Sequence, residues 1–339
     1  MLQVFIERIM LTGNERDFKM DIHVIYACIG FLLAAYAIIG NDAVQTLGTF
    51  IASNSKIMKW YWLWAAASLV LIVTISYSWA VNGGDISYGR LNKIPHIDVQ
   101  WYHAAAPLIL VLLTRIGIPV STTFLVLSTF ASTLVLEDML IKSVIGYGLA
   151  AVVAYALWLV ISRIVNEKHN MVKKQNRMKW YILQWSATGF LWHSWLSHDM
   201  ANIAVFLPRN LPLWLLFAIL TVLCGWLGFI FWNRGGKIQK IILEKSGTRF
   251  IRSATIIDFV YALILLYFKQ LNEIPMSTTW VFVGLLTGRE LAIATTYRAT
   301  YKAGYVFPLI GKDFLKMMIG LGVSVALALI IHYILEPMI

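Results

Sequence analysis

Ten long apolar stretches divide the chain of 339 residues, and this pattern most constrains its fold. A helix needs about 20 apolar residues to cross the hydrocarbon core of a membrane, and most of the stretches approach this length. Charged residues make up 13% of the chain, about half their share in a soluble domain. The composition excludes an ordinary soluble enzyme, and its aromatic and apolar content excludes a disordered chain. The stretches are residues 22–39, 60–81, 104–114, 118–136, 141–162, 180–197, 212–232, 253–270, 276–295 and 314–335.

The sequence therefore predicts an all-α polytopic membrane protein with about ten to twelve membrane segments, some of them broken or re-entrant. The segments 41–54 and 198–209 are too short and too polar to span alone. The stretch 104–114 is also short and is followed by Pro119, which interrupts a helix. Residues 104–136 form either two crossings or a re-entrant hairpin. Both alternatives return the chain to the same side of the membrane, so the direction of every later crossing does not depend on the choice.

In a chain this apolar, the net charge of +11 indicates contact with membrane lipid and not binding of a nucleic acid. Basic residues collect in short cytoplasmic loops, beside anionic lipid. If the basic loop 163–179 is cytoplasmic, most other loop Lys and Arg residues also fall inside, and both termini lie outside. Cys28 and Cys224 both lie in apolar runs, so neither a disulfide framework nor a CxxC metal site is available. We expect an integral protein of the plasma membrane.

Two pairs of motifs repeat along the chain. Asp42 and Ser121 are separated by 79 positions, and Asp199 and Ser277 by 78. Five apolar stretches per half is an odd number, so the second copy enters the membrane from the opposite side, as in many secondary transporters. The predicted organisation is an N-terminal arm (1–21), a first transmembrane repeat (22–162), a basic cytoplasmic linker (163–179) and a second transmembrane repeat (180–339).

A Pro-x-Ser-Thr-Thr string occurs once in each half, at residues 119–123 and 275–279. Each string is expected to begin a long apolar helix. For one string alone, a helix cap is the simpler interpretation. Two strings at matching positions favour an anion site, because helix N-termini and hydroxyl groups donate to oxyanions. The predicted ligands of a tetrahedral anion are Ser121, Thr122, Thr123, Ser277, Thr278 and Thr279.

An acidic residue accompanied by amides occurs once in each half. Acids at membrane depth are costly, and they usually pair with a cation or line a polar path. Carboxylate and amide oxygens suit hard cations, and by extension Na⁺. For either residue alone, a cap or an acid at the membrane interface is an equal alternative. The predicted cation-binding residues are Asn41, Asp42, Gln45, Asp199 and Asn202.

Catalytic metal chemistry is not expected. His193 and His198 are five positions apart and do not share a helix face, and an HExxH motif is absent. We predict no enzyme activity, no transition metal and no cofactor apart from the coupling ion. Asp258 either lines the pathway or lies near the membrane interface, and Arg289-Glu290 is interpreted as a self-compensating pair.

These residues resemble motifs of the inorganic phosphate transporter (PiT) family of ion-coupled symporters, which includes some sulfate permeases. Residues 40–49 (GNDAVQTLGT) and 197–202 (SHDMAN) resemble its Gly-Ala-Asn-Asp-Val-Ala-Asn-Ala motifs, with Gln45 and His198 in place of Asn. The two Ser-Thr-Thr strings resemble its Pro-Val-Ser-Thr-Thr-His motifs, with Phe124 and Trp280 in place of His. The resemblance extends in order and spacing over residues 22 to 335.

The resemblance implies a secondary transporter that imports inorganic phosphate together with Na⁺ or H⁺. It places phosphate at the six hydroxyls and the cation near the Asn-Asp motifs, and it implies a homodimer in the lipid bilayer. Because His198 can accept a proton near neutral pH, proton coupling through it stays open. The alternatives are a permease for sulfate or another tetrahedral oxyanion, and a membrane sensor that binds the anion without moving it.

Overall fold

The computed structural model describes residues 22–55, 57–116, 120–164, 177–233, 251–271, 277–296, 303–335 and 337. Every regular element in these ranges is helical. The predicted arm (1–21) and most of the predicted linker (163–179) lie outside the described residues. The helices are α2 (Ile22–Asn54), α3 (Trp60–Val81), α4 (Trp101–Ile116), α5 (Thr133–Ile164), α6 (Arg177–Asp199), α7 (Ala201–Ala204), α8 (Leu213–Trp232), α10 (Ile251–Leu271), α11 (Thr278–Thr296) and α12 (Ala303–Ile330), with π-helical turns η1 (Thr123–Leu127) and η4 (Ile331–Leu335).

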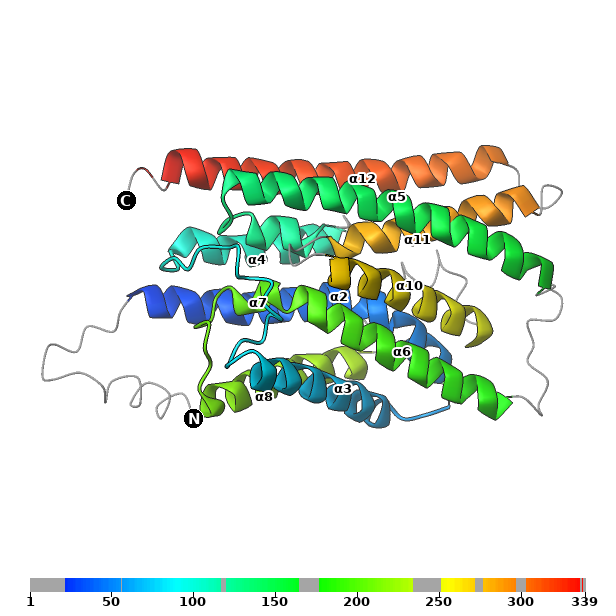
Figure 1. Ribbon diagram of the computed structural model, residues 1–339, viewed down its shortest axis with the longest axis horizontal. Helices are drawn as coiled ribbons and strands as arrows, with labels where there is room; N and C mark the ends of the chain where they lie inside the picture. The colour runs from blue at the N-terminus through cyan, green and yellow to red at the C-terminus, as the bar shows by residue number, and fades with distance from the viewer. Residues whose placement is uncertain are drawn as a thin grey trace, which may run out of the picture.

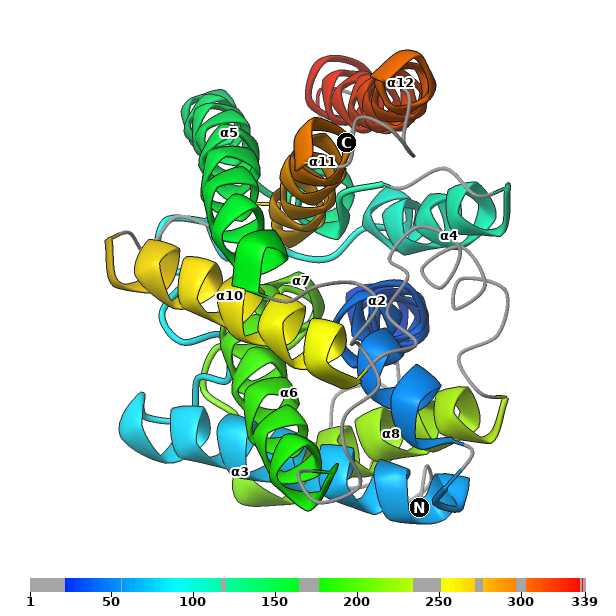
Figure 2. The same cartoon turned by 90° about the vertical axis from the view of Figure 1, so that its right-hand side faces the viewer.

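The long helices run side by side along the longest axis of the molecule (Figure 1). The end-on view places α2 near the centre, and α2 contacts α4, α6 and α8 (Figure 2). Among the described residues, five helices are long and apolar enough to cross a membrane, namely α2, α3, α5, α8 and α12. The fold is therefore that of an all-α polytopic membrane protein. Helix α2 begins, and the C-terminal helix ends, at the same end of the bundle.

The polar segment 41–54, too short and too polar to span alone, continues the helix of the apolar stretch 22–39. Both belong to α2, a single helix of 33 residues. The polar side chains are tolerated because neighbouring helices satisfy them, as a polar residue in a bundle interior requires. Asn54 Nδ2, for example, donates to Gln184 Oε1 of α6 at 3.1 Å.

The prediction of one long helix starting at the first Ser-Thr-Thr string is wrong. After this string the chain forms the five-residue turn η1, then turns through 128–132 before α5 begins at Thr133. Ser128 and Thr129 lie in this turn, and Thr129 Oγ1 bonds back to Val126 O at 2.7 Å. Such local bonds compete with a continuing helix. The second string does begin a long helix, the 19-residue α11.

Helices α4, α10 and α11 reach only to the middle of the bundle. In Figure 1, α4 occupies one half of the long axis, whereas α10 and α11 occupy the other half. The chain returns from the middle after each of α4 and α10, at η1 and at the start of α11. The broken ends, including both Ser-Thr-Thr strings, are thereby brought to mid-bundle, which corresponds to the re-entrant alternative for 104–136.

Helices α5 and α11 pack unusually closely through two glycines. A Cβ atom added to Gly284 would collide with the carbonyl oxygen of Tyr147, and one added to Gly288 would collide with that of Ala151. Small residues four positions apart permit such backbone contact between membrane helices. The glycines therefore fix how α11, which begins with the second string, lies on α5.

We predict that Gly288→Ala lowers the unfolding temperature of the detergent-purified protein, because an added methyl group in a filled interface costs about 1–3 kcal/mol. Gly148→Ala is the matched control on the same helix pair, since Gly148 is exposed and a Cβ there meets nothing within 4 Å. Equal stability of the two variants in a thermal unfolding assay would contradict the close contact.

Candidate functional site

The two Ser-Thr-Thr strings lie next to each other in the interior of the bundle. All six hydroxyl residues are buried, with 1–4% of their surface exposed. Phe124 and Trp280, which follow the two strings, are in ring contact with centroids 5.8 Å apart. Hydrogen bonds to a shared carboxylate also join the strings, as the next paragraph describes. The structure therefore brings together residues more than 150 positions apart in the sequence.

Asp199, at the end of α6, is the centre of this cluster. Its Oδ2 accepts from Thr278 Oγ1 at 2.6 Å, and its Oδ1 accepts from Thr123 Oγ1 at 3.3 Å. Asn202 Nδ2 donates to Asp199 Oδ1 at 3.1 Å and lies 3.1 Å from Thr122 Oγ1. One carboxylate thus joins threonines of both strings.

Asp42 lies in the same cluster, on the central helix α2, and is fully buried. Its Oδ1 accepts from Asn41 Nδ2 at 2.7 Å and, weakly, from Gln45 Nε2 at 3.4 Å. Its Oδ2 has no hydrogen-bond partner among the described residues. Asp42 and Asp199 are close enough for their charges to repel each other. All five predicted cation-binding residues therefore lie close to the predicted anion ligands.

The serines of the two strings act as helix caps, the simpler interpretation considered for these motifs. Ser121 Oγ accepts from the backbone N–H of Phe124, and Ser277 Oγ from that of Trp280, each at 3.2 Å. Capping uses the oxygen as an acceptor. The hydroxyl hydrogen of each serine is still available to donate, so capping and anion binding are compatible.

Three buried polar atoms of the cluster have no hydrogen-bond partner among the residues that the structure describes: Asp42 Oδ2, Asn202 Oδ1 and Thr279 Oγ1. Buried polar atoms without partners are rare and need an explanation. The carboxylate and amide oxygens only accept, so a metal cation or a proton donor suits them. The threonine hydroxyl can donate, so an oxyanion suits it.

His198, the predicted proton site, lies just outside this cluster. Its Nε2 is 2.6 Å from the backbone oxygen of Leu265 and 3.4 Å from Arg90 Nη2. Because a carbonyl oxygen only accepts, this contact requires a hydrogen on Nε2 of the His198 ring. Whether His198 carries a coupling proton stays a prediction.

Two buried charged residues near the site were not predicted as part of it. Asp258 of α10 is 1% exposed and accepts from Thr49 Oγ1 at 2.8 Å and from Thr188 Oγ1 at 2.6 Å. The buried position corresponds to the pathway alternative for this acid. Arg90, in the loop between α3 and α4, is 3% exposed and donates to Ser197 O at 3.0 Å. Nothing in the sequence around Arg90 distinguishes it from other loop arginines.

The predicted pair Arg289-Glu290 lies outside this cluster. Its Arg289 Nη1 and Glu290 Oε1 atoms form an ion pair 3.0 Å long, and the guanidinium carbon of Arg289 lies 5.2 Å from the ring centroid of Trp158.

Among the described residues, no group of three or more His, Cys, Asp or Glu side chains could hold a metal ion.

Neither a protein-family model nor a curated protein matches the chain. Among solved structures, the chain is similar to one described as the sodium-dependent phosphate transporter, with a TM-score of 0.64 and 17% sequence identity. The similarity covers 94% of this chain and 100% of that one. At this identity the likeness concerns the fold, so the chain has the fold of that transporter over nearly its whole length.

Proposed function

We propose that the protein is a cation-coupled secondary transporter that imports inorganic phosphate. The observation that carries this proposal is the meeting of two buried Ser-Thr-Thr strings with two buried carboxylates at mid-bundle. The solved structure with the same fold is that of a sodium-dependent phosphate transporter, which supports the substrate. The phosphate ligands are Ser121, Thr122, Thr123, Ser277, Thr278 and Thr279, and the cation ligands are Asn41, Asp42, Gln45, Asp199 and Asn202.

Hydroxyl groups and helix N-termini explain how an anion is held. Thr278 is the first residue of α11, so free backbone N–H groups and the positive end of the helix dipole lie beside the string. Thr279 Oγ1 is buried and available to donate. A tetrahedral oxyanion with several acceptor oxygens matches these donors.

The coupling cation follows from charge balance. A phosphate beside Asp42 and Asp199 brings further negative charge into a buried site that already holds two carboxylates. Like charges at short distance in a low dielectric repel strongly. A bound cation removes this penalty, so phosphate and cation bind together better than either binds alone. Asp42 Oδ2, a buried acceptor without a hydrogen-bond donor among the described residues, is the clearest ligand position for Na⁺.

The two halves act as inverted repeats. Support comes from the hairpins, because α4 with η1 enters the middle from one end of the bundle, whereas α10 with α11 enters from the other (Figure 1). Sites between inverted repeats near the membrane midplane suit alternating access. In this proposal both termini lie outside the plasma membrane, and the coupling ion is Na⁺, with H⁺ through His198 as the alternative.

Two other functions fit parts of this geometry. A sulfate permease would use the same hydroxyl donors, and unlabelled sulfate would then compete fully with labelled phosphate. A sensor would bind the anion saturably without carrying it across a membrane. Broken elements entering from both ends favour transport, because a sensor needs no access from two sides.

We predict that Asp42→Asn abolishes gradient-driven uptake of radiolabelled phosphate by proteoliposomes, because the amide no longer offers a charged ligand to the cation. The initial rate should fall at least roughly tenfold, the effect of losing about 1.4 kcal/mol of binding. Uptake is measured with an inward Na⁺ gradient, with a proton gradient and with neither.

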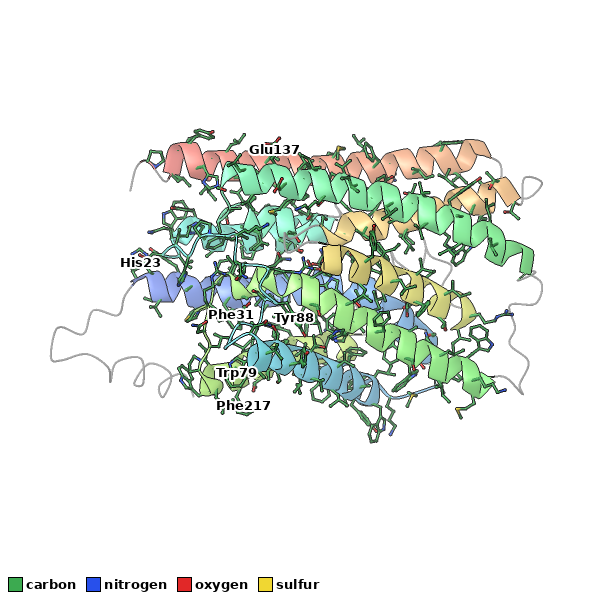
Figure 3. The ribbon with its side chains drawn as sticks, in the orientation of Figure 1. His23, Phe31, Trp79, Tyr88, Glu137 and Phe217 are labelled. Carbon is green, nitrogen blue, oxygen red and sulfur yellow. The ribbon has the colours of Figure 1, made fainter. Side chains whose placement is uncertain are left out.

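Glu137→Gln is the matched control for this loss of charge, since Glu137 is exposed on α5 at the edge of the bundle (Figure 3). It should transport like the wild type. Wild-type uptake that ignores both gradients, or an Asp42→Asn variant that transports normally, would refute the proposed coupling.

We also predict that Thr279→Val weakens phosphate binding in detergent by roughly ten- to hundredfold. The buried Thr279 Oγ1 has no partner among the described residues, and a hydrogen bond to a charged group contributes about 1.5–3 kcal/mol. Isothermal titration calorimetry with inorganic phosphate measures this change. Thr255→Val is the control, because Thr255 Oγ1 donates within its own helix, to Ile251 O at 2.7 Å. Equal phosphate affinities of the two variants would remove Thr279 from the site.

A further inference from the structure

Arg90 places a positive charge beside one of the two carboxylates. Its Nε donates to Ser197 O at 3.0 Å, and its Nη2 lies 3.4 Å from His198 Nε2. Both partners directly precede Asp199 in α6. The guanidinium therefore lies at the end of α6 that carries Asp199, where a positive charge attracts a carboxylate.

A well-ordered loop between α3 and α4 holds Arg90 in this position. The Asp85 carboxylate accepts from the backbone N–H of Ser87 at 2.7 Å and from that of Gly89 at 2.8 Å. Tyr88 has a φ of 58°, a left-handed conformation that is unusual for a residue with a side chain. Its hydroxyl donates to Thr74 O of α3 at 2.7 Å. Figure 3 shows Tyr88 over the middle of the bundle and not at its end.

The two carboxylates have different surroundings. Both oxygens of Asp199 accept hydrogen bonds, whereas Asp42 Oδ2 has no partner among the described residues. The unpartnered oxygen on the Asp199 side belongs to Asn202, a neutral amide. The preceding residue also differs, because Asn41 donates to Asp42 while His198 contacts Arg90.

We propose that Arg90 is a resident cation that replaces one exchangeable coupling cation. Of the cation ligands proposed above, those on the Asp42 side take Na⁺ from solution. Those on the Asp199 side, Asp199 and Asn202, take no exchangeable cation, because the guanidinium neutralises that side permanently. Arg90 thus acts as a positioning and charge-balancing residue. This inference rests on the proposed function, since it concerns the cations that accompany phosphate.

The number of sodium ions that bind with phosphate tests this proposal. At constant ionic strength, the slope of the logarithm of phosphate affinity against the logarithm of Na⁺ concentration gives that number by linkage. We measure it by titrating the full-length protein in detergent with inorganic phosphate, replacing Na⁺ by choline. The expected slope by linkage is about one for the wild type and about two for Arg90→Gln, whose Asp199 side then needs a second sodium ion.

Three further variants separate charge from structure. Arg90→Lys keeps the charge and should keep the wild-type slope. Arg90→Gln combined with Asp199→Asn removes both charges and should restore a slope of about one by the same linkage. Arg209→Gln controls for loosening of the loop, because Arg209 Nη2 donates to Ile94 O of the same loop at 3.1 Å; its slope should match the wild type.

Each outcome decides between the two proposals. A wild type that binds no phosphate at any Na⁺ concentration refutes the proposed function, and this inference with it. A sodium-dependent wild type with an unchanged slope in Arg90→Gln overturns the inference alone. If Arg90→Gln does not bind at all, the double variant decides: sodium-dependent binding there supports the inference, and its absence overturns it.

Discussion

The burial of two carboxylates near each other in the middle of an apolar bundle is the constraint on which the rest depends. Asp42 and Asp199 are 0–1% exposed, so bulk solvent does not screen their repulsion. Donors from the protein must therefore stabilise them. The intact helix α2 supplies side-chain donors, Asn41 and Gln45, but its backbone groups are already paired. Broken elements also offer backbone donors, and both Ser-Thr-Thr strings lie where such elements end.

The same constraint explains why some helices of the bundle are less apolar than membrane helices usually are. The 23-residue α6 is too polar to count among the five candidate spans. Its buried polar residues face α2 and α10, where Gln184 meets Asn54 and Thr188 meets Asp258. Helices α3 and α8 lie at the edge of the bundle and are apolar enough to count among those five spans.

Apolar length, motif spacing and residue chemistry were enough to predict the helical class and the cluster of candidate ligands. Asp42 and Asp199 are recognisable because acids are rare within apolar sequence. The exact helix limits were not predictable, because residues 41–54 are helical only through partners contributed by distant segments. The break at 128–132 is accompanied by a local hydrogen bond from Thr129 Oγ1 to Val126 O, which hydropathy does not register. Arg90 was missed because loop arginines are common and only the fold buries this one.

The glycine contacts between α5 and α11 have a consequence for movement. Helix α5 belongs to the first half of the chain and α11 to the second, yet Gly284 and Gly288 bring their backbones into contact. Interfaces packed this tightly slide little, because any shift drives backbone atoms into one another. Any displacement of α11 would therefore carry α5, a helix from the other half of the chain, along with it as a single rigid body.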